Sequence, residues 1–366
     1  WGATGNPFNP SLNAGGSSGG SAAALACDML PLCTGSDTGG SLRIPAALCG
    51  VVGLRPSPGL VANDMRPLGW SAISVLGPMG RDVNDTAFMM QASVGPHPMD
   101  PLSLGVQHEA FWPVRQADLR KLRVAYTEDF GACAVDPMIR RTFRERVQAL
   151  SREVAVCEPL QWDLSDGHRC FDVIRAESFF AAFEEVYRTQ PDTLGPNVRA
   201  NVEMAASIRL ADRAWAHLVQ TRINRQFQAA FEQYDLILAP TTPLSPFPWT
   251  ELYAEVVDGQ KQRNYYEWLS LTYMVTLATN PAVSLPCGRD EAGMPFGLQM
   301  VGPLHQDARL LGMALALEQW GNTQTGWGRP RPDMGLLATP RPELKSIVTH
   351  PPLLAGGSKV EARNAV

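Results

Sequence analysis

The chain has 366 residues, a formal net charge of −5 and a hydrophobic content of 45%. This length is enough for one large domain or two smaller ones with a sizeable core. Charged residues make up only 18% of the chain and form no basic block, which excludes the clustered cations that nucleic-acid binding requires. No apolar run approaches the length of a membrane span, so we expect no membrane partner.

The cysteines indicate the compartment. There are seven of them, an odd number, and no pair has C-x-x-C spacing. This pattern disfavours a zinc site and a disulfide framework, and it favours free thiols in a reducing, cytoplasmic environment. We expect no metal and no organic cofactor. Because the first residue is Trp1 rather than methionine, we also expect that the natural chain has further residues before it.

The first part of the chain alternates between expected helices and strands. Alanine-rich residues 21–29 predict a helix, which Ser21 can cap. A Gly/Ser-rich loop precedes this helix, and a second one precedes the next helix. In chain order we expect a loop at 15–21, a helix at 21–29, a buried strand at 30–34, a loop at 35–41, a helix at 42–48 and a strand at 51–54.

The same alternation continues further along. Ile139, Phe143, Val147 and Leu150 recur at helical spacing and predict an amphipathic helix. The later expected elements are a strand at 122–126, helices at 137–153 and 211–233, strands at 234–240, 282–285 and 297–301, and a helix at 307–319. Such alternation predicts an α/β fold, with a mixed, mostly parallel central sheet that helices cover on both sides.

Domain organisation follows from where this pattern ends. Residues 1–320 are expected to form one domain. From residue 321 onward proline and glycine are dense and the periodicity fades. We therefore expect residues 321–366 to be an extended or disordered C-terminal tail.

The two Gly/Ser-rich loops are the strongest functional signal. Ser17 and Ser41 are 24 residues apart, which leaves room for one helix and one strand between them. Both loops can therefore lie at the same edge of the sheet, with the two serines close together. Glycine allows a close approach of the backbone, and successive N–H groups can stabilise a developing oxyanion. Neither loop is a Walker loop or a G-x-S-x-G nucleophile elbow.

These loops and several later segments resemble the signature of the amidase signature family. The resemblance covers about nine-tenths of the chain. It implies the amidase signature fold, with residues 1–320 forming an amidase signature domain that lacks its N-terminal part. The segments that carry it are 15–21, 35–46, 49–56, 76–83, 239–243, 280–286 and 297–299.

The resemblance also implies roles for individual residues. Ser41 would be the nucleophile that accepts the acyl group, and Ser17 would be the second serine, preceded by a cis peptide bond. The backbone N–H groups of the oxyanion hole would belong to Thr38, Gly39, Gly40 and Ser41, and the residues that brace the loops would be Ser18, Asp37 and Arg43.

A serine nucleophile needs a base, and in the resembled family that base is a lysine upstream of the second serine. Here no lysine precedes Lys121, whose position matches nothing in the family pattern, and no histidine precedes His97. We therefore expect the catalytic lysine to be missing from this chain, and this chain to show little turnover.

Three functions are compatible with these observations. The first is an amidase that hydrolyses a small carboxylic amide through an acyl-enzyme. The second is the glutaminase (A) subunit of a tRNA-dependent amidotransferase, which would need companion subunits. The third is a catalytically dead fragment that serves as a binding module. Residues 68–75 depart from the pattern expected of the amidotransferase subunit, which favours the first. A homodimer is left open, and the identity of the amide does not follow from the sequence.

Each candidate residue also has a structural interpretation. The two serines could belong to purely structural loops, Arg43 could form a structural ion pair, and Asp37 could stabilise a turn. A cluster of aromatic residues could line an acyl pocket or, at helical spacing, belong to the core. These aromatic residues are Tyr265, Tyr266, Trp268 and Tyr273.

Overall fold

The computed structural model describes residues 2–345 and is built around an eight-stranded sheet. The strands of this sheet are β3 (Leu32–Asp37), β4 (Val52–Arg55), β5 (Val75–Gly80), β6 (Arg123–Tyr126), β7 (Val156–Pro159), β8 (Leu236–Pro240), β11 (Ala282–Arg289) and β12 (Pro295–Val301). Their spatial order is β3-β5-β4-β11-β12-β8-β6-β7. Two small hairpins complete the strands, β1 (Gly5–Asn6) with β2 (Asn9–Asn13) and β9 (Val256–Val257) with β10 (Gln260–Lys261).

The sheet is mixed, but antiparallel pairs predominate. Five neighbouring pairs, from β3 to β8, are antiparallel, and the two pairs β8–β6 and β6–β7 are parallel. The prediction of an α/β fold with a mixed sheet flanked by helices is therefore confirmed, whereas the prediction of a mostly parallel sheet was wrong. Strand direction depends on how each connection folds back, for instance in the tight β11–β12 hairpin, and alternation of elements does not determine it.

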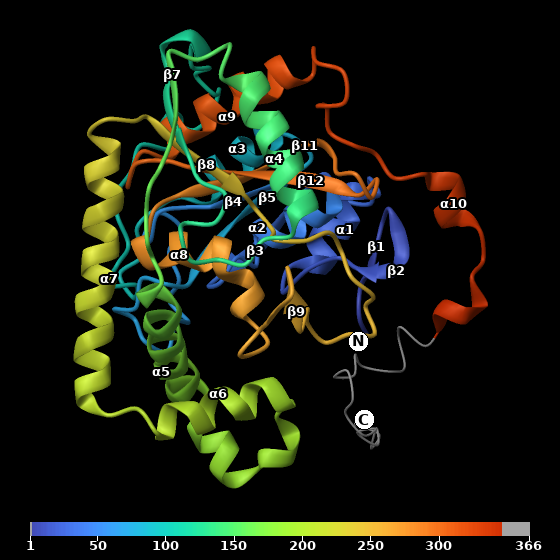
Figure 1. The fold of residues 1–366 in the computed structure, drawn as a ribbon. Coiled ribbons are helices and arrows are strands. Elements are labelled where there is room, and N and C mark those ends of the chain that lie inside the picture. Colours follow the sequence, from blue (N-terminus) through green and yellow to red (C-terminus); the bar gives the residue numbers. More distant parts are fainter. Residues whose placement is uncertain (1, 346–366) are drawn as a thin grey trace.

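Ten α-helices accompany the sheet within the described residues. They are α1 (Gly19–Ala26), α2 (Arg43–Cys49), α3 (Val83–Ser93), α4 (Pro137–Leu150), α5 (Asp166–Thr189), α6 (Pro196–Ala206), α7 (Leu210–Phe231), α8 (Ser270–Ala278), α9 (Asp307–Gly321) and α10 (Met334–Ala338). Helix α2 lies against β4, β11 and β12. Helix α3 lies against β5, helix α9 lies against β11, and the two helices contact each other. Helix α5 contacts both α6 and α7, and α5 and α6 project below the sheet in the view of Figure 1.

Two local predictions around the first loop need correction. Helix α1 begins at Gly19 rather than at residue 21, so Ser21 lies inside it, and its hydroxyl donates to the carbonyl of Thr34 instead of capping the helix. Strand β3 runs through Gly35 and Ser36 to Asp37, into the predicted second loop, and it is only partly buried. The two serines nevertheless remain outside regular strands.

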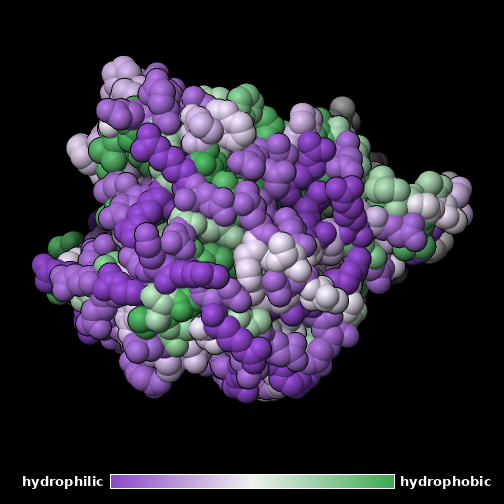
Figure 2. Space-filling view, turned by 90° about the horizontal axis from the view of Figure 1, so that it is seen from above, coloured by the Kyte–Doolittle hydropathy of each residue, from purple (hydrophilic) through white to green (hydrophobic). Residues whose placement is uncertain are grey.

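The apolar residues of the central strands and of α9 form one continuous core. Viewed from above, the surface is mostly hydrophilic, with small hydrophobic patches between polar regions (Figure 2). Within residues 2–345, no helix combines the length and the apolar character needed to cross a bilayer. The predicted tail is described as far as residue 345 and contains α10. Residues 346–366 of that prediction lie outside the described part.

Candidate active site

A cavity of about 620 Å³ is lined by both predicted serines, Ser17 and Ser41. Ser17 lies just before α1 and is exposed, and Ser41 lies just before α2 and is partly buried. The convergence of the two loops, which was predicted from the helix and strand between them, is therefore present. Opposite the loops, the cavity is bounded by α5 and by two segments near residues 247–252 and 265–269.

Backbone contacts join the two loops directly. The N–H group of Ser18 donates to the carbonyl of Ser41 over 3.3 Å. The N–H group of Ser36 donates to the hydroxyl of Ser18 over 3.4 Å. The peptide bond between Gly16 and Ser17 is cis, as the family resemblance led us to expect. Ser18 thus holds the loop of Ser17 against the loop of Ser41.

Three of the four N–H groups proposed for the oxyanion hole belong to residues that line the cavity. These are Thr38, Gly39 and Ser41, and within residues 2–345 their N–H groups donate to no protein acceptor. Gly40 differs, because its N–H group donates to Asp37 Oδ1 over 3.0 Å. The structure thus corrects the prediction at Gly40, whose N–H group is already engaged.

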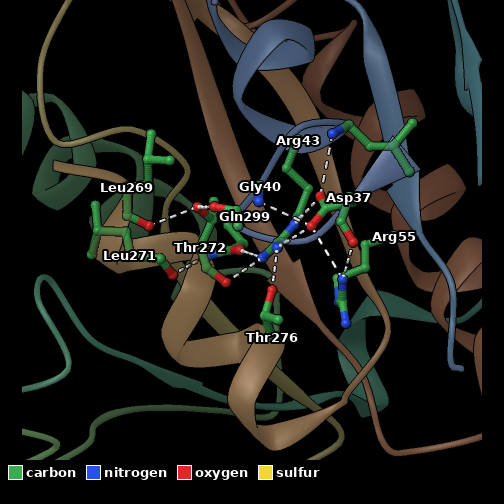
Figure 3. A network of polar contacts seen from close by, with 11 residues as sticks. Asp37, Gly40, Arg43, Arg55, Leu269, Leu271, Thr272, Thr276 and Gln299 are labelled. Atoms are coloured by element: carbon green, nitrogen blue, oxygen red, sulfur yellow. Dashed lines mark hydrogen bonds and ion pairs between the residues drawn. The ribbon is translucent and has the colours of Figure 1, made fainter. Parts of the chain in front are cut away.

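Asp37 organises the loop of Ser41 from within the core (Figure 3). Its two carboxylate oxygens accept hydrogen bonds from Arg43 Nε and Nη2 over 3.0 and 2.8 Å, and they also accept from the backbone of Gly40 and Leu42. Arg55 Nη1 donates to Asp37 Oδ1 over 3.2 Å. Burial alone would raise the pKa of Asp37, but the two arginines hold it at about 2. Asp37 is therefore a buried anion that fixes the loop.

Arg43 extends this network to two distant elements. Its Nη1 group donates to the carbonyl of Thr272 on α8 over 2.8 Å and to the side chain of Gln299 on β12 over 2.6 Å. Thr272 Oγ1 in turn donates to the carbonyl of Gly39 over 2.5 Å. Both Asp37 and Arg43 are fully buried. Their hydrogen bonds fix the loop, and neither residue lines the cavity.

The wall that faces the serines is largely aromatic, and most of it was not predicted. Of the four aromatic residues considered for an acyl pocket, three line the cavity, whereas Tyr273 is buried and bonded to His168. The contribution of α5 was not predicted, because residues 166–189 were not recognised as a helix. Phe171, Arg175 and Phe179 follow one another at four-residue steps on α5, and this periodicity was the available signal. The other large residues of this wall are Phe247, Trp249, Leu252, Tyr265, Tyr266, Trp268 and Leu269.

The described part of the cavity wall contains no lysine and no histidine. Lys121 is exposed and lies 3.7 Å from Asp118, and Lys261 is exposed on β10. Ser17 also lines a second cavity of about 410 Å³, together with Ser18, residues 34–36 and Leu76. Ser17 is therefore accessible from two sides.

Comparison with known proteins identifies the arrangement. The sequence model of the Amidase family matches residues 1–311. The chain belongs to the Amidase family. A curated relative of this amidase is the A subunit of the glutamyl-tRNA(Gln) amidotransferase of Acaryochloris marina, with 35% identity over 357 residues, which cover 90% of this chain and 72% of the relative.

Solved structures show the same fold. A bacterial aryl acylamidase of the amidase signature family matches with a TM-score of 0.77 and 25% identity, over 87% of this amidase and 68% of that chain. A 6-aminohexanoate cyclic dimer hydrolase in complex with its substrate matches with a TM-score of 0.77 and 26% identity, over 91% of this amidase and 73% of that chain. The chain is thus a member of a family of hydrolases that act on carbon–nitrogen bonds.

Proposed function

We propose that this amidase cleaves a carboxylic amide through an acyl-enzyme on Ser41. The observation that carries the proposal is the shared cavity, which Ser17 and Ser41 line together with Thr38 and Gly39. Within residues 2–345 the backbone N–H groups of Thr38, Gly39 and Ser41 donate to no protein acceptor. A hydroxyl adjacent to preorganised N–H donors is the arrangement that acyl transfer requires, because the donors stabilise the oxyanion of the tetrahedral intermediate.

The reaction would proceed in two stages. Ser41 Oγ attacks the amide carbonyl, and the resulting oxyanion is held by the N–H groups of Thr38, Gly39 and Ser41. Ser17 transfers the proton of Ser41 to the leaving nitrogen, so that the amine departs and an ester with Ser41 remains. Water then hydrolyses this ester and regenerates the hydroxyl. Gly40 is left out of the oxyanion hole because its N–H group is bonded to Asp37.

The base for this relay is a lysine in the resembled family, and we propose that this lysine is missing from this chain. The absence of lysine and histidine from the described cavity wall supports this assignment. The second cavity beside Ser17 offers such a group a place from which to accept the serine proton. Without this lysine, the chain would react slowly. A catalytically dead binding module therefore stays an alternative function.

The names of the curated relatives favour the glutaminase subunit over the stand-alone amidase. The relatives from Acaryochloris marina and Thermosynechococcus vestitus both bear the name of the A subunit of glutamyl-tRNA(Gln) amidotransferase. In that case glutamine would be the amide, and companion subunits would receive the ammonia. One structural observation favours the stand-alone amidase, namely the largely aromatic wall of the cavity, which suits a bulky or apolar acyl group. We therefore propose glutamine as the first substrate to test and apolar amides as the second.

The location and the partners of the protein are part of the same proposal. Its seven cysteines form no disulfide, and all of them lie within the described residues, which supports a reducing, cytoplasmic location. The partner we propose is a small-molecule amide, and a homodimer and an assembly with companion subunits are both open to measurement by the molecular mass in solution.

Covalent labelling with a fluorophosphonate probe tests the proposed nucleophile. Because the base is missing, wild type should be labelled slowly, Ser41→Ala should not be labelled, and Ser17→Ala should be labelled more slowly than wild type. Adding a primary amine such as butylamine at pH 9–10 should accelerate labelling of the wild-type chain, because the amine can replace the missing base. Equal labelling of wild type and Ser41→Ala, with or without amine, would exclude Ser41 as the nucleophile.

A further inference from the structure

Arg175 is a charged residue in the cavity that the proposed mechanism does not use. It lies near the middle of α5, one turn after Phe171 and one turn before Phe179, and all three line the cavity of the two serines. Arg175 and Phe179 also line a neighbouring cavity of about 230 Å³, which is bounded on its other side by residues 63–74. The guanidinium group therefore lies where two cavities adjoin.

The partners of Arg175 are aromatic rather than acidic. Its Nη2 group donates to the hydroxyl of Tyr265. Its guanidinium carbon lies 4.3 Å from the ring centre of Phe179 and 4.9 Å from that of Tyr266. Its Nε atom is buried and has no hydrogen-bond partner among the described residues. Within residues 2–345, Arg175 forms no ion pair.

The acidic groups near Arg175 are engaged elsewhere or exposed. Asp172, three residues earlier on α5, accepts hydrogen bonds from Arg263 and from the hydroxyl of Tyr266. Glu267 is also bonded to Arg263. Glu251 lines the same cavity but is exposed to solvent. No carboxylate of the described protein thus compensates the charge of Arg175.

An uncompensated arginine in a cavity indicates an anionic ligand. Guanidinium stays protonated at all physiological pH values and carries donors spaced to bind a carboxylate through two hydrogen bonds. A partly buried cation with an unpartnered donor is unfavourable until such a group arrives. The aromatic rings around Arg175 restrict its rotation, which keeps the donors directed without the entropy loss of a free side chain.

We propose that Arg175 binds a carboxylate on the non-reacting part of the substrate, so that the preferred substrates are amides that carry a distal carboxylate. This inference rests on the proposed function, because it places the reacting amide at Ser41. The apolar body between the two groups packs against Phe171 and Phe179. Glutamine satisfies the carboxylate requirement, but its ammonium group would find only the exposed Glu251 as an acidic partner on the described cavity wall. The acid without the amino group, 4-carbamoylbutanoate, is therefore the better match.

Binding to the Ser41→Ala chain, measured by isothermal titration calorimetry, tests this assignment without depending on catalysis. The probes form matched pairs, 4-carbamoylbutanoate with pentanamide and 4-carbamoylbenzoate with 4-methylbenzamide, in which a methyl group replaces the carboxylate. We expect at least one anionic amide to bind at least tenfold more tightly than its neutral partner, and glutamine to bind more weakly than 4-carbamoylbutanoate. Equal affinity within both pairs, or no binding by either anion, would overturn the proposal.

Variants in the same Ser41→Ala background identify the residue responsible. Arg175→Gln should bring the anionic and neutral probes within about twofold of each other, while Arg175→Lys should retain part of the preference. Arg188→Gln removes the same charge from an exposed position on α5 and should retain the full preference. Far-UV circular dichroism and thermal melting verify the fold of each variant. A preference that persists in folded Arg175→Gln would contradict the assignment, as would its loss in Arg188→Gln.

The outcomes separate this inference from the proposed function. If Ser41 is not labelled but the carboxylate preference depends on Arg175, the nucleophile is wrong and the binding site stands. If Ser41 is labelled but the matched pairs bind equally, the hydrolase stands and the role of Arg175 is wrong. Tighter binding of glutamine than of 4-carbamoylbutanoate would contradict the preference we infer and favour the glutaminase subunit.

Discussion

Gly40 is the residue at which backbone conformation limits the sequence of the nucleophile loop most strongly. Its φ angle is +123°, a region that residues with a side chain rarely adopt. A Cβ atom added here would lie 2.7 Å from Thr272 Cβ and 2.7 Å from Ile44 Cδ1. Both neighbours are buried and cannot move freely. The glycine therefore permits the close approach of this loop to α8.

Gly40→Ala should lower the free energy of unfolding by about 2–4 kcal/mol, because strain and overpacking add. It should also slow labelling of Ser41, since the neighbouring N–H groups would be displaced. Urea denaturation and the labelling rate measure these effects. The control is Gly20→Ala in α1, where the nearest non-local atom is 4.0 Å from the added Cβ. This control should be neutral or stabilising, and an equally tolerated Gly40→Ala would refute the prediction.

Among the elements, α8 contacts the loop of Ser41 although more than 200 residues separate the two in the sequence. Thr272 Oγ1 donates to the carbonyl of Gly39, while its own carbonyl accepts from Arg43. Strand β12 contributes similarly, since Gln299 accepts from Arg43 and donates to the carbonyl of Leu271. The loop of Ser41 is thus held between α8 and β12 by buried polar contacts (Figure 3).

Thr272→Val tests whether α8 positions the loop, because valine keeps the shape of threonine but removes the hydroxyl. We expect a loss of about 1–2 kcal/mol in the free energy of unfolding, since the buried carbonyl of Gly39 would lose its partner. Labelling of Ser41 should slow as well. Thr221→Val on the exposed face of α7 is the matched control. Unchanged stability and labelling in Thr272→Val would show that this contact does not position the loop.

At this scale the sequence predicted some elements well and others not at all. The helices predicted at 137–153 and 211–233 are present as α4 and α7, and the first was predicted because apolar residues recur at helical spacing over several turns. Strand β5 was missed because Gly77, Pro78 and Gly80 interrupt its β-forming residues. The two serines were predicted from their loops, whereas Arg175 was missed, because its role depends on which groups the fold places around it.

At the scale of the whole molecule, buried acids with opposite pKa shifts contribute to the dependence of stability on pH. Asp307, the first residue of α9, is buried, and its carboxylate accepts from the N–H and the hydroxyl of Ser57. Burial raises its pKa from 3.8 to about 6. Asp37 has the opposite shift, to about 2, so its stabilising contribution is present above about pH 4 and lost as the pH falls towards 2.

For Asp307 the change of stability with pH has the opposite sign. Between about pH 4 and 6 the folded chain keeps a proton that the unfolded chain releases, so stability falls as the pH rises through this window, by about 2–3 kcal/mol. Asp307→Asn should remove this fall, which urea unfolding at pH 4, 5, 6 and 7 can measure. The decline caused by Glu318, whose pKa is raised by burial to about 7, should remain. Asp192→Asn, at a fully exposed position, is the control. An Asp307→Asn profile identical to that of wild type would argue against the shift.

The two sides of the main cavity come from separate stretches of the chain, residues 3–41 on one side and residues 171–179 and 247–269 on the other. Exchange of α5 or of the 247–252 segment between homologues would therefore alter selectivity while leaving the reacting hydroxyls in place. Such a division allows substitutions on the recognition side to change the fit of a substrate without touching the reacting groups, because the two lie in different parts of the same polypeptide.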